Sequence, residues 1–135
     1  SAVNIIKGLQ FITEVKKLEG KQPMMVECFA TWCPPCRKAI PHLAKMHEEY
    51  KNVFIVSVST ETEKEVNNLK ANMPLMSKYN LALDATGNLD KLMEENEVGG
   101  IPHAFIFNAE DKLVWHGHPM SGECSEWLKK LNEAK

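Results

Sequence analysis

The chain has 135 residues, 44% of them hydrophobic and 25% charged, which is enough for one globular domain over residues 1–135 with a buried core. Sixteen basic and eighteen acidic side chains give a formal charge of −2 with no basic block, and this argues against a nucleic-acid partner. No apolar run approaches the ~20 residues that cross a bilayer, and the first residues do not form a signal peptide, so we expect a soluble chain, although a removed signal or anchor would leave no trace.

The N-terminal part is expected to contain a helix followed by a buried strand. Apolar residues at positions 11–18 recur at helical spacing, and Gly20 would end that helix. Residues 24–30 are apolar except for Glu27, which predicts a central strand buried on both faces of a sheet. The predicted apolar face of the first helix consists of Phe11, Ile12, Val15 and Leu18.

A long helix is expected over residues 33–50. Pro41 lies inside it and is expected to kink it, because an internal proline removes a hydrogen bond and clashes with the preceding turn. The buried face of this helix is predicted to contain Ile40, Leu43, Ala44 and His47.

The remaining chain continues to alternate between strands and helices. We expect strands at 53–59 and 81–83, helices at 63–72 and 88–96, a hairpin of strands 104–107 and 112–116, and a closing helix at 121–132. Pro74 marks a break after the helix at 63–72. This order predicts an α/β fold in which a mixed sheet is covered by helices on both faces.

Residues 30–37 read Ala-Thr-Trp-Cys-Pro-Pro-Cys-Arg and place Cys33 and Cys36 one helical turn apart. If a helix begins there, Pro34 and Pro35 occupy its first two positions, where a missing N–H costs little. The Cys33 sulfur would then cap the helix and face unpaired N–H groups, which lower a cysteine pKa into a range of about 3.5–7.5. Cys36 lies on the same face and would attack a mixed disulfide at Cys33. The pattern indicates a redox dithiol that needs no other cofactor.

Half of a zinc site has the same Cys-x-x-Cys spacing. Structural zinc needs four Cys or His ligands, commonly with a second close pair. The other two cysteines, Cys28 and Cys124, are isolated in the sequence. We therefore expect no metal at the dithiol, and we expect Cys28 and Cys124 to be unpaired.

Residues 26–36, the later Pro41, and Gly99-Gly100-Ile101-Pro102 before an apolar strand resemble thioredoxin-fold proteins, and the resemblance covers nearly the whole chain. Within that superfamily the chain is most similar to the TlpA-like thiol-disulfide oxidoreductases, with nucleoredoxin and tryparedoxin as relatives that share the Trp-Cys-Pro-Pro-Cys centre. The subfamily similarity rests on residues 40–43, on the long segment between residues 60 and 98, and on residues 115–119.

The resemblance implies a thioredoxin fold with an extra segment between the second buried strand and a cis-proline loop. In such folds this loop faces the dithiol, so Ile101 and a cis Pro102 would dock an extended substrate chain, and Trp32 would shield the sulfurs and contact partners. The alternatives are a trans proline at a strand start and a half-buried Trp32 that only fixes its loop.

Glu27 lies six residues before Cys33, within the apolar strand. A buried acid is costly unless it is neutral or paired, and burial raises its pKa, so Glu27 is a candidate proton acceptor for Cys36. Thioredoxins carry an aspartate at the matching position, which leaves the distance from Glu27 to Cys36 open. The alternative is a glutamate at the strand edge that reaches solvent.

His116 and His118 lie two residues apart on a predicted strand, and His103 precedes the neighbouring strand. This spacing would allow a shared metal, but histidines without nearby acidic ligands are more often ordinary strand-end side chains. We therefore expect no metal here.

These observations predict a monomeric thiol-disulfide oxidoreductase that reduces protein disulfides. Cys33 attacks, Cys36 resolves, Glu27 accepts the proton, and an unidentified upstream reductant restores the dithiol. Unpaired cysteines and no visible export signal favour the cytoplasm, whereas bacterial TlpA-like relatives are commonly exported. The alternative function is a metal-binding module or chaperone that uses the dithiol and the late histidines. The residues expected to present the substrate are Trp32, Ile101 and Pro102.

Overall fold

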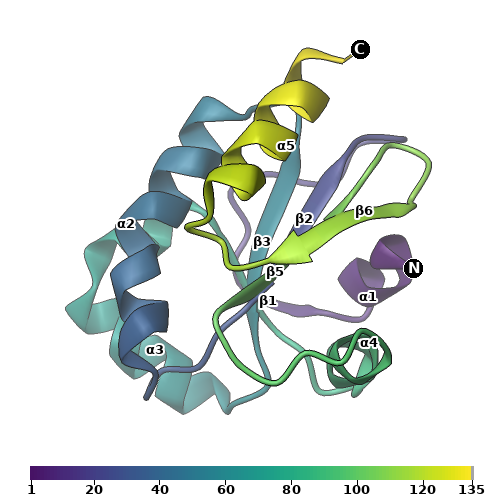
Figure 1. Ribbon diagram of the computed structural model, residues 1–135. Helices are drawn as coiled ribbons and strands as arrows, with labels where there is room; N and C mark the ends of the chain where they lie inside the picture. The colour runs from purple at the N-terminus through teal and green to yellow at the C-terminus, as the bar shows by residue number, and fades with distance from the viewer. Residues whose placement is uncertain (135) are drawn as a thin grey trace.

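The computed structural model describes residues 1–134 and contains a six-stranded mixed sheet (Figure 1). The strand order is β1-β4-β3-β2-β5-β6. Strands β2, β3 and β4 are parallel, whereas β1 pairs antiparallel with β4, β5 with β2, and β6 with β5. The strands are β1 Gln10–Thr13, β2 Met24–Cys28, β3 Phe54–Ser59, β4 Asn80–Leu83, β5 His103–Phe107 and β6 Leu113–Gly117.

Helices cover both faces of this sheet, as predicted. Helices α2, α3 and α5 pack on one face, and α1 and α4 pack on the other (Figure 1). The helices are α1 Ala2–Lys7, α2 Pro34–Glu49, α3 Glu63–Asn72, α4 Asn88–Glu95 and α5 Gly122–Glu133, and the 3-10 helix η1 is Pro74–Lys78. No helix within residues 1–134 has the length and apolar composition needed to cross a membrane.

Strand β2 is fully buried because the sheet has a hydrophobic layer on each side. Met25 packs in the layer beneath α2, and Met24 and Val26 pack in the opposite layer. Since side chains alternate along a strand, Glu27 lies on the same face as Met25 and therefore faces α2. The sheet thus places one buried acid beneath the helix that carries the dithiol.

The helix predicted from the apolar residues at 11–18 is wrong. The chain forms a short helix earlier, α1, which ends at Gly8, and then the edge strand β1. Phe11 packs against the α1 and α4 side of the sheet, whereas Ile12 packs against the α2 side. These apolar residues therefore follow a strand period of two, and pairing with β4 determines their conformation.

The prediction for the long helix is confirmed. Helix α2 spans Pro34–Glu49 and buries Ile40, Leu43 and His47, while Ala44 is half-buried. Pro41 lies inside the helix, where it cannot donate a hydrogen bond to the preceding turn. The kink expected at Pro41 stays a prediction.

Candidate active site

The dithiol lies at the N-terminus of α2. Cys33 is the N-cap residue, and Pro34 and Pro35 occupy the first helical positions. The Cys36 backbone N–H donates a hydrogen bond to the Cys33 sulfur over 3.3 Å. The predicted capping geometry is therefore present.

The two thiols differ in how they can be approached. Cys33 lines a surface groove, and its sulfur lies 3.7 Å from the Ile101 carbonyl oxygen. Cys33 and Cys36 are both buried, at 3% and 2% exposed, but only Cys33 lines that groove. Both thiols are free in this structure. A substrate disulfide in the groove would thus meet Cys33 first, with Cys36 behind it.

The groove beside Cys33, here called the dithiol groove, has a volume of about 530 Å³. Its walls are largely apolar, and Trp32 stands at its edge with 70% of its surface exposed. The alternative of a half-buried Trp32 is therefore wrong, and the indole is free to contact a partner. The groove is lined by Trp32, Cys33, Pro34, Pro35, Met93, Val98, Gly99, Gly100 and Ile101.

The loop before β5 forms the opposite wall of the dithiol groove. The Ile101–Pro102 peptide bond is cis, as the resemblance implied, and this excludes the trans alternative. Pro102 is buried and Ile101 is half-buried, so Ile101 is the residue of the pair that lines the groove.

Glu27 is fully buried on β2, opposite Ser57 of β3 and Ala104 of β5. Neither of its carboxyl oxygens has a hydrogen-bond partner among the described residues. Burial raises the pKa of Glu27 to about 8, and the nearby Ser57 hydroxyl, which does not reach hydrogen-bond geometry, offsets a little of this rise. The alternative of a solvent-facing glutamate is therefore wrong.

Cys36 lies in the same buried environment. Burial raises the pKa of Cys36 to about 12, and the adjacent Cys33 sulfur and the charge of Glu27 contribute to this rise. A thiol with such a pKa does not ionise by itself near neutral pH, so Cys36 needs a base before it can act as a nucleophile.

Glu61 holds the loop that precedes the dithiol, and no motif in the sequence pointed to it. Its carboxylate accepts hydrogen bonds from the Thr31 N–H at 2.7 Å, the Thr31 hydroxyl at 2.6 Å and the Ser59 hydroxyl at 2.8 Å. Arg37 donates to the Thr31 carbonyl at 2.8 Å. Thr31 is thus fixed from both sides, immediately before Trp32 and Cys33.

Cys28 and Cys124 are free, as predicted, and both are buried. The Cys124 thiol lies 3.8 Å from the Met25 sulfur, and burial raises the pKa of Cys124 to about 12. Within residues 1–134, no group of three or more His, Cys, Asp or Glu side chains is arranged to hold a metal ion. The structure therefore does not bring the dithiol and the late histidines into one metal site.

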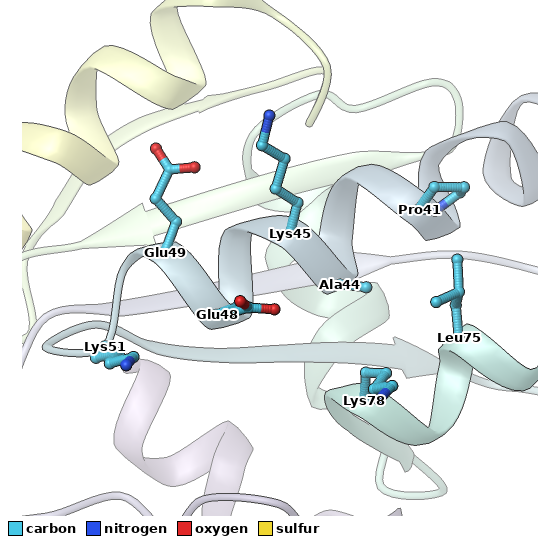
Figure 2. A pocket seen from close by; sticks show the side chains of 8 residues that line it. All are labelled: Pro41, Ala44, Lys45, Glu48, Glu49, Lys51, Leu75 and Lys78. Atoms are coloured by element: carbon cyan, nitrogen blue, oxygen red, sulfur yellow. The ribbon is translucent and has the colours of Figure 1, made fainter.

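A second pocket of about 500 Å³ lies between α2 and η1 (Figure 2). Figure 2 shows Leu75 of η1 pointing towards Pro41 of α2, and lysine and glutamate side chains make up most of the other residues that line the pocket. The mixed charges favour no single class of ionic ligand, and none of the residues proposed for catalysis lines this pocket.

Comparison of the sequence with known families gives one match over most of the chain. The profile described as the AhpC/TSA family matches residues 9–116. Thiol-disulfide oxidoreductase ResA from a strain of Bacillus cereus is 31% identical over 104 residues, which cover 75% of this chain and 57% of ResA. This chain therefore spans less than two thirds of that relative.

Solved structures with the same fold include a thiol-disulfide isomerase from Corynebacterium glutamicum, with a TM-score of 0.72 and 14% identity over 93% of this chain and 92% of that one. The exposed lipoprotein thioredoxin Etrx1 of Streptococcus pneumoniae gives a TM-score of 0.67 and 19% identity over 82% of this chain and 86% of that one. At these identities the similarity establishes the thioredoxin fold.

Proposed function

Because this chain belongs to the AhpC/TSA family of thioredoxin-fold proteins, we propose that it is a thiol-disulfide oxidoreductase that exchanges disulfides through Cys33 and Cys36. The observation that carries this proposal is the hydrogen bond from the Cys36 N–H to the Cys33 sulfur at the start of α2, at the wall of an apolar groove. The similarity to ResA, a thiol-disulfide oxidoreductase by name, supports it.

In the first step the Cys33 thiolate attacks a substrate disulfide. The bond between Cys33 and one substrate sulfur forms, and the substrate S–S bond breaks. The departing substrate sulfur leaves as a thiolate and takes a proton from water. Cys33 suits this step because its sulfur accepts a backbone hydrogen bond and lines the groove.

In the second step Cys36 attacks the Cys33 sulfur of the mixed disulfide. Glu27 accepts the Cys36 proton, a disulfide between Cys33 and Cys36 forms, and the second substrate sulfur leaves as a thiolate. A pKa of about 8 makes Glu27 a base matched to neutral pH, whereas an ordinary glutamate would hold a proton too weakly. The net change is reduction of the substrate disulfide and oxidation of the dithiol.

The substrates are proposed to be protein disulfides. The dithiol groove is apolar and open, and Trp32 and Ile101 flank Cys33 on its two sides. Such a surface contacts the residues next to a substrate cysteine. An upstream reductant, itself a dithiol donor, is required to return Cys33 and Cys36 to the reduced state after each turnover.

The compartment is a separate proposal. Free Cys28 and Cys124 favour a reducing compartment such as the cytoplasm, whereas the pneumococcal protein of the same fold is described as an exposed lipoprotein. Fractionation of cells that produce the natural full-length protein tests this. We expect it in the cytosolic fraction, and recovery in the envelope would support the exported alternative.

Trapping of the mixed disulfide tests the exchange mechanism. Cys36→Ser is expected to accumulate a covalent complex with a disulfide-containing protein such as insulin, because Cys33 attacks but nothing resolves the product. Cys33→Ser is expected to give no complex and no turnover, and Cys124→Ser is the matched control with normal turnover. Retained reductase activity in Cys33→Ser would contradict the proposed function.

A further inference from the structure

We propose that His103 and His116 form a site for a first-row divalent metal ion, with Zn²⁺ as its simplest occupant. The His103 Nε2 and His116 Nδ1 atoms lie 2.9 Å apart on the adjacent strands β5 and β6. This site is separate from the dithiol and does not depend on the proposed exchange reaction.

The distance between the two nitrogens suits a shared metal ion. Imidazole nitrogens bind zinc at about 2.0–2.1 Å, so two of them on one tetrahedral ion lie about 3.3 Å apart, and the pair at 2.9 Å has to open by only a few tenths of an ångström. Without a metal, one proton lies between Nε2 of His103 and Nδ1 of His116. Two neutral imidazoles carry one N–H each, so metal entry moves this proton to the other nitrogen of its own ring, and each ring keeps one N–H with no net proton release.

The two rings are held in place before any metal binds. The Phe105 ring packs against both of them, with centroid distances of 5.1 Å to His103 and 5.5 Å to His116. Pairing of β5 with β6 fixes the backbone on both sides. Binding therefore immobilises few additional side chains, which lowers its entropic cost.

The site has two protein ligands. Among the described residues no third His, Cys, Asp or Glu completes it, and the nearby His118 accepts the Met120 N–H at its Nδ1 over 3.1 Å. Water would fill the remaining coordination positions, so binding is expected to be reversible and weaker than at a structural zinc site.

Titration of Zn²⁺ into the protein with its Cys33–Cys36 disulfide formed tests the site, because oxidation removes those thiols as ligands. Calorimetry is expected to show one equivalent bound, and NMR of the imidazole nitrogens should shift His103 Nε2 and His116 Nδ1. His103→Gln and His116→Ala should each weaken binding at least tenfold. His118→Ala, which removes an exposed histidine of the same region, is the matched control and should change the affinity less than threefold.

Exposed His116 can be replaced with little risk to the fold, so its variant keeps the test decisive even if His103→Gln is unstable. Three outcomes would overturn the proposal: no Zn²⁺ binding, unchanged binding in His116→Ala, or a loss in His118→Ala as large as in His116→Ala. None of these results bears on disulfide exchange, so the failure of one proposal is distinguishable from failure of the other.

Discussion

The Glu27 carboxyl lies on β2 without a hydrogen-bond partner for either oxygen among the described residues, beneath the helix that carries Cys36. An ionised carboxylate in such a place costs free energy, and this is why burial raises its pKa to about 8. The same property makes Glu27 a base that can take a proton from a buried thiol. Stability and reactivity are therefore opposed at this residue.

Glu27→Gln is expected to stabilise the protein in a pH-dependent way. The unfolded carboxyl ionises above pH 4.5 and the folded one only above about pH 8, so the folded state loses stability as pH rises between these values. Glutamine does not ionise, so the variant should gain about 3 kcal/mol over the wild type between pH 5 and pH 8, at ~1.4 kcal/mol per pKa unit. Urea unfolding of both proteins at pH 5 and pH 8 measures this. The same difference in unfolding free energy between variant and wild type at the two pH values would contradict the burial argument.

The same substitution is expected to slow resolution more than attack. Without the Glu27 base, Cys36 at pH 7 should resolve the mixed disulfide ~100-fold more slowly, which is at the low end of general-base effects. Attack by Cys33 should change little because its sulfur is stabilised by a backbone N–H instead. Stopped-flow measurement separates the two steps, and equal slowing of both would remove Glu27 from the proton path.

At the scale of elements, the start of α2 depends on the loop that Glu61 holds. Glu61→Ala removes three hydrogen bonds to a carboxylate, two of them from Thr31. We expect it to lower the free energy of unfolding by about 2 kcal/mol and to slow attack by Cys33, because Thr31 precedes Trp32 and Cys33. Glu94→Ala, an exposed change in α4, is the control and should cost less than about 0.5 kcal/mol in urea unfolding. Equal stability of the two variants would contradict the role given to Glu61.

Helices and strands that form because of neighbouring residues could be predicted from the sequence. Those that depend on pairing or packing with distant segments of the chain could not. The start of α2 follows from Cys33 and two adjacent prolines, and the structure places it there. The apolar spacing at 11–18 favours a helix, but β1 forms instead because it pairs with β4, a segment far away in the chain. Met93 in the dithiol groove and Glu61 below Thr31 could not be predicted for the same reason.

At the scale of the whole molecule, the buried core contains two titratable groups with opposite pH dependences, Glu27 of β2 and His47 of α2. His47 is buried on α2 and neither ring nitrogen has a hydrogen-bond partner among the described residues. Burial, and then the charge of Lys16, lower the pKa of His47 below 6.5. Ionisation of Glu27 thus lowers the free energy of unfolding as pH rises, and protonation of His47 lowers it as pH falls.

His47→Gln is expected to reduce the loss of stability in acid. The unfolded imidazole takes up a proton at about pH 6.5 and the folded one only at lower pH, so the wild type loses stability as pH falls through this window. The variant lacks this group, and its unfolding free energy should fall less between pH 7 and pH 5. Urea unfolding at the two pH values measures the difference. A steeper fall in the variant would show that the buried His47 is stabilised as the charged form.

The central claim is that Cys33 and Cys36 form one reversible disulfide. Equilibration of the protein in buffers of varied glutathione ratio, followed by alkylation and peptide mass spectrometry, measures this for each cysteine. We predict a single two-electron transition in which Cys33 and Cys36 oxidise together while buried Cys28 and Cys124 stay reduced. The absence of a Cys33–Cys36 disulfide at every ratio, or a transition that involves Cys28 or Cys124 instead, would contradict the account.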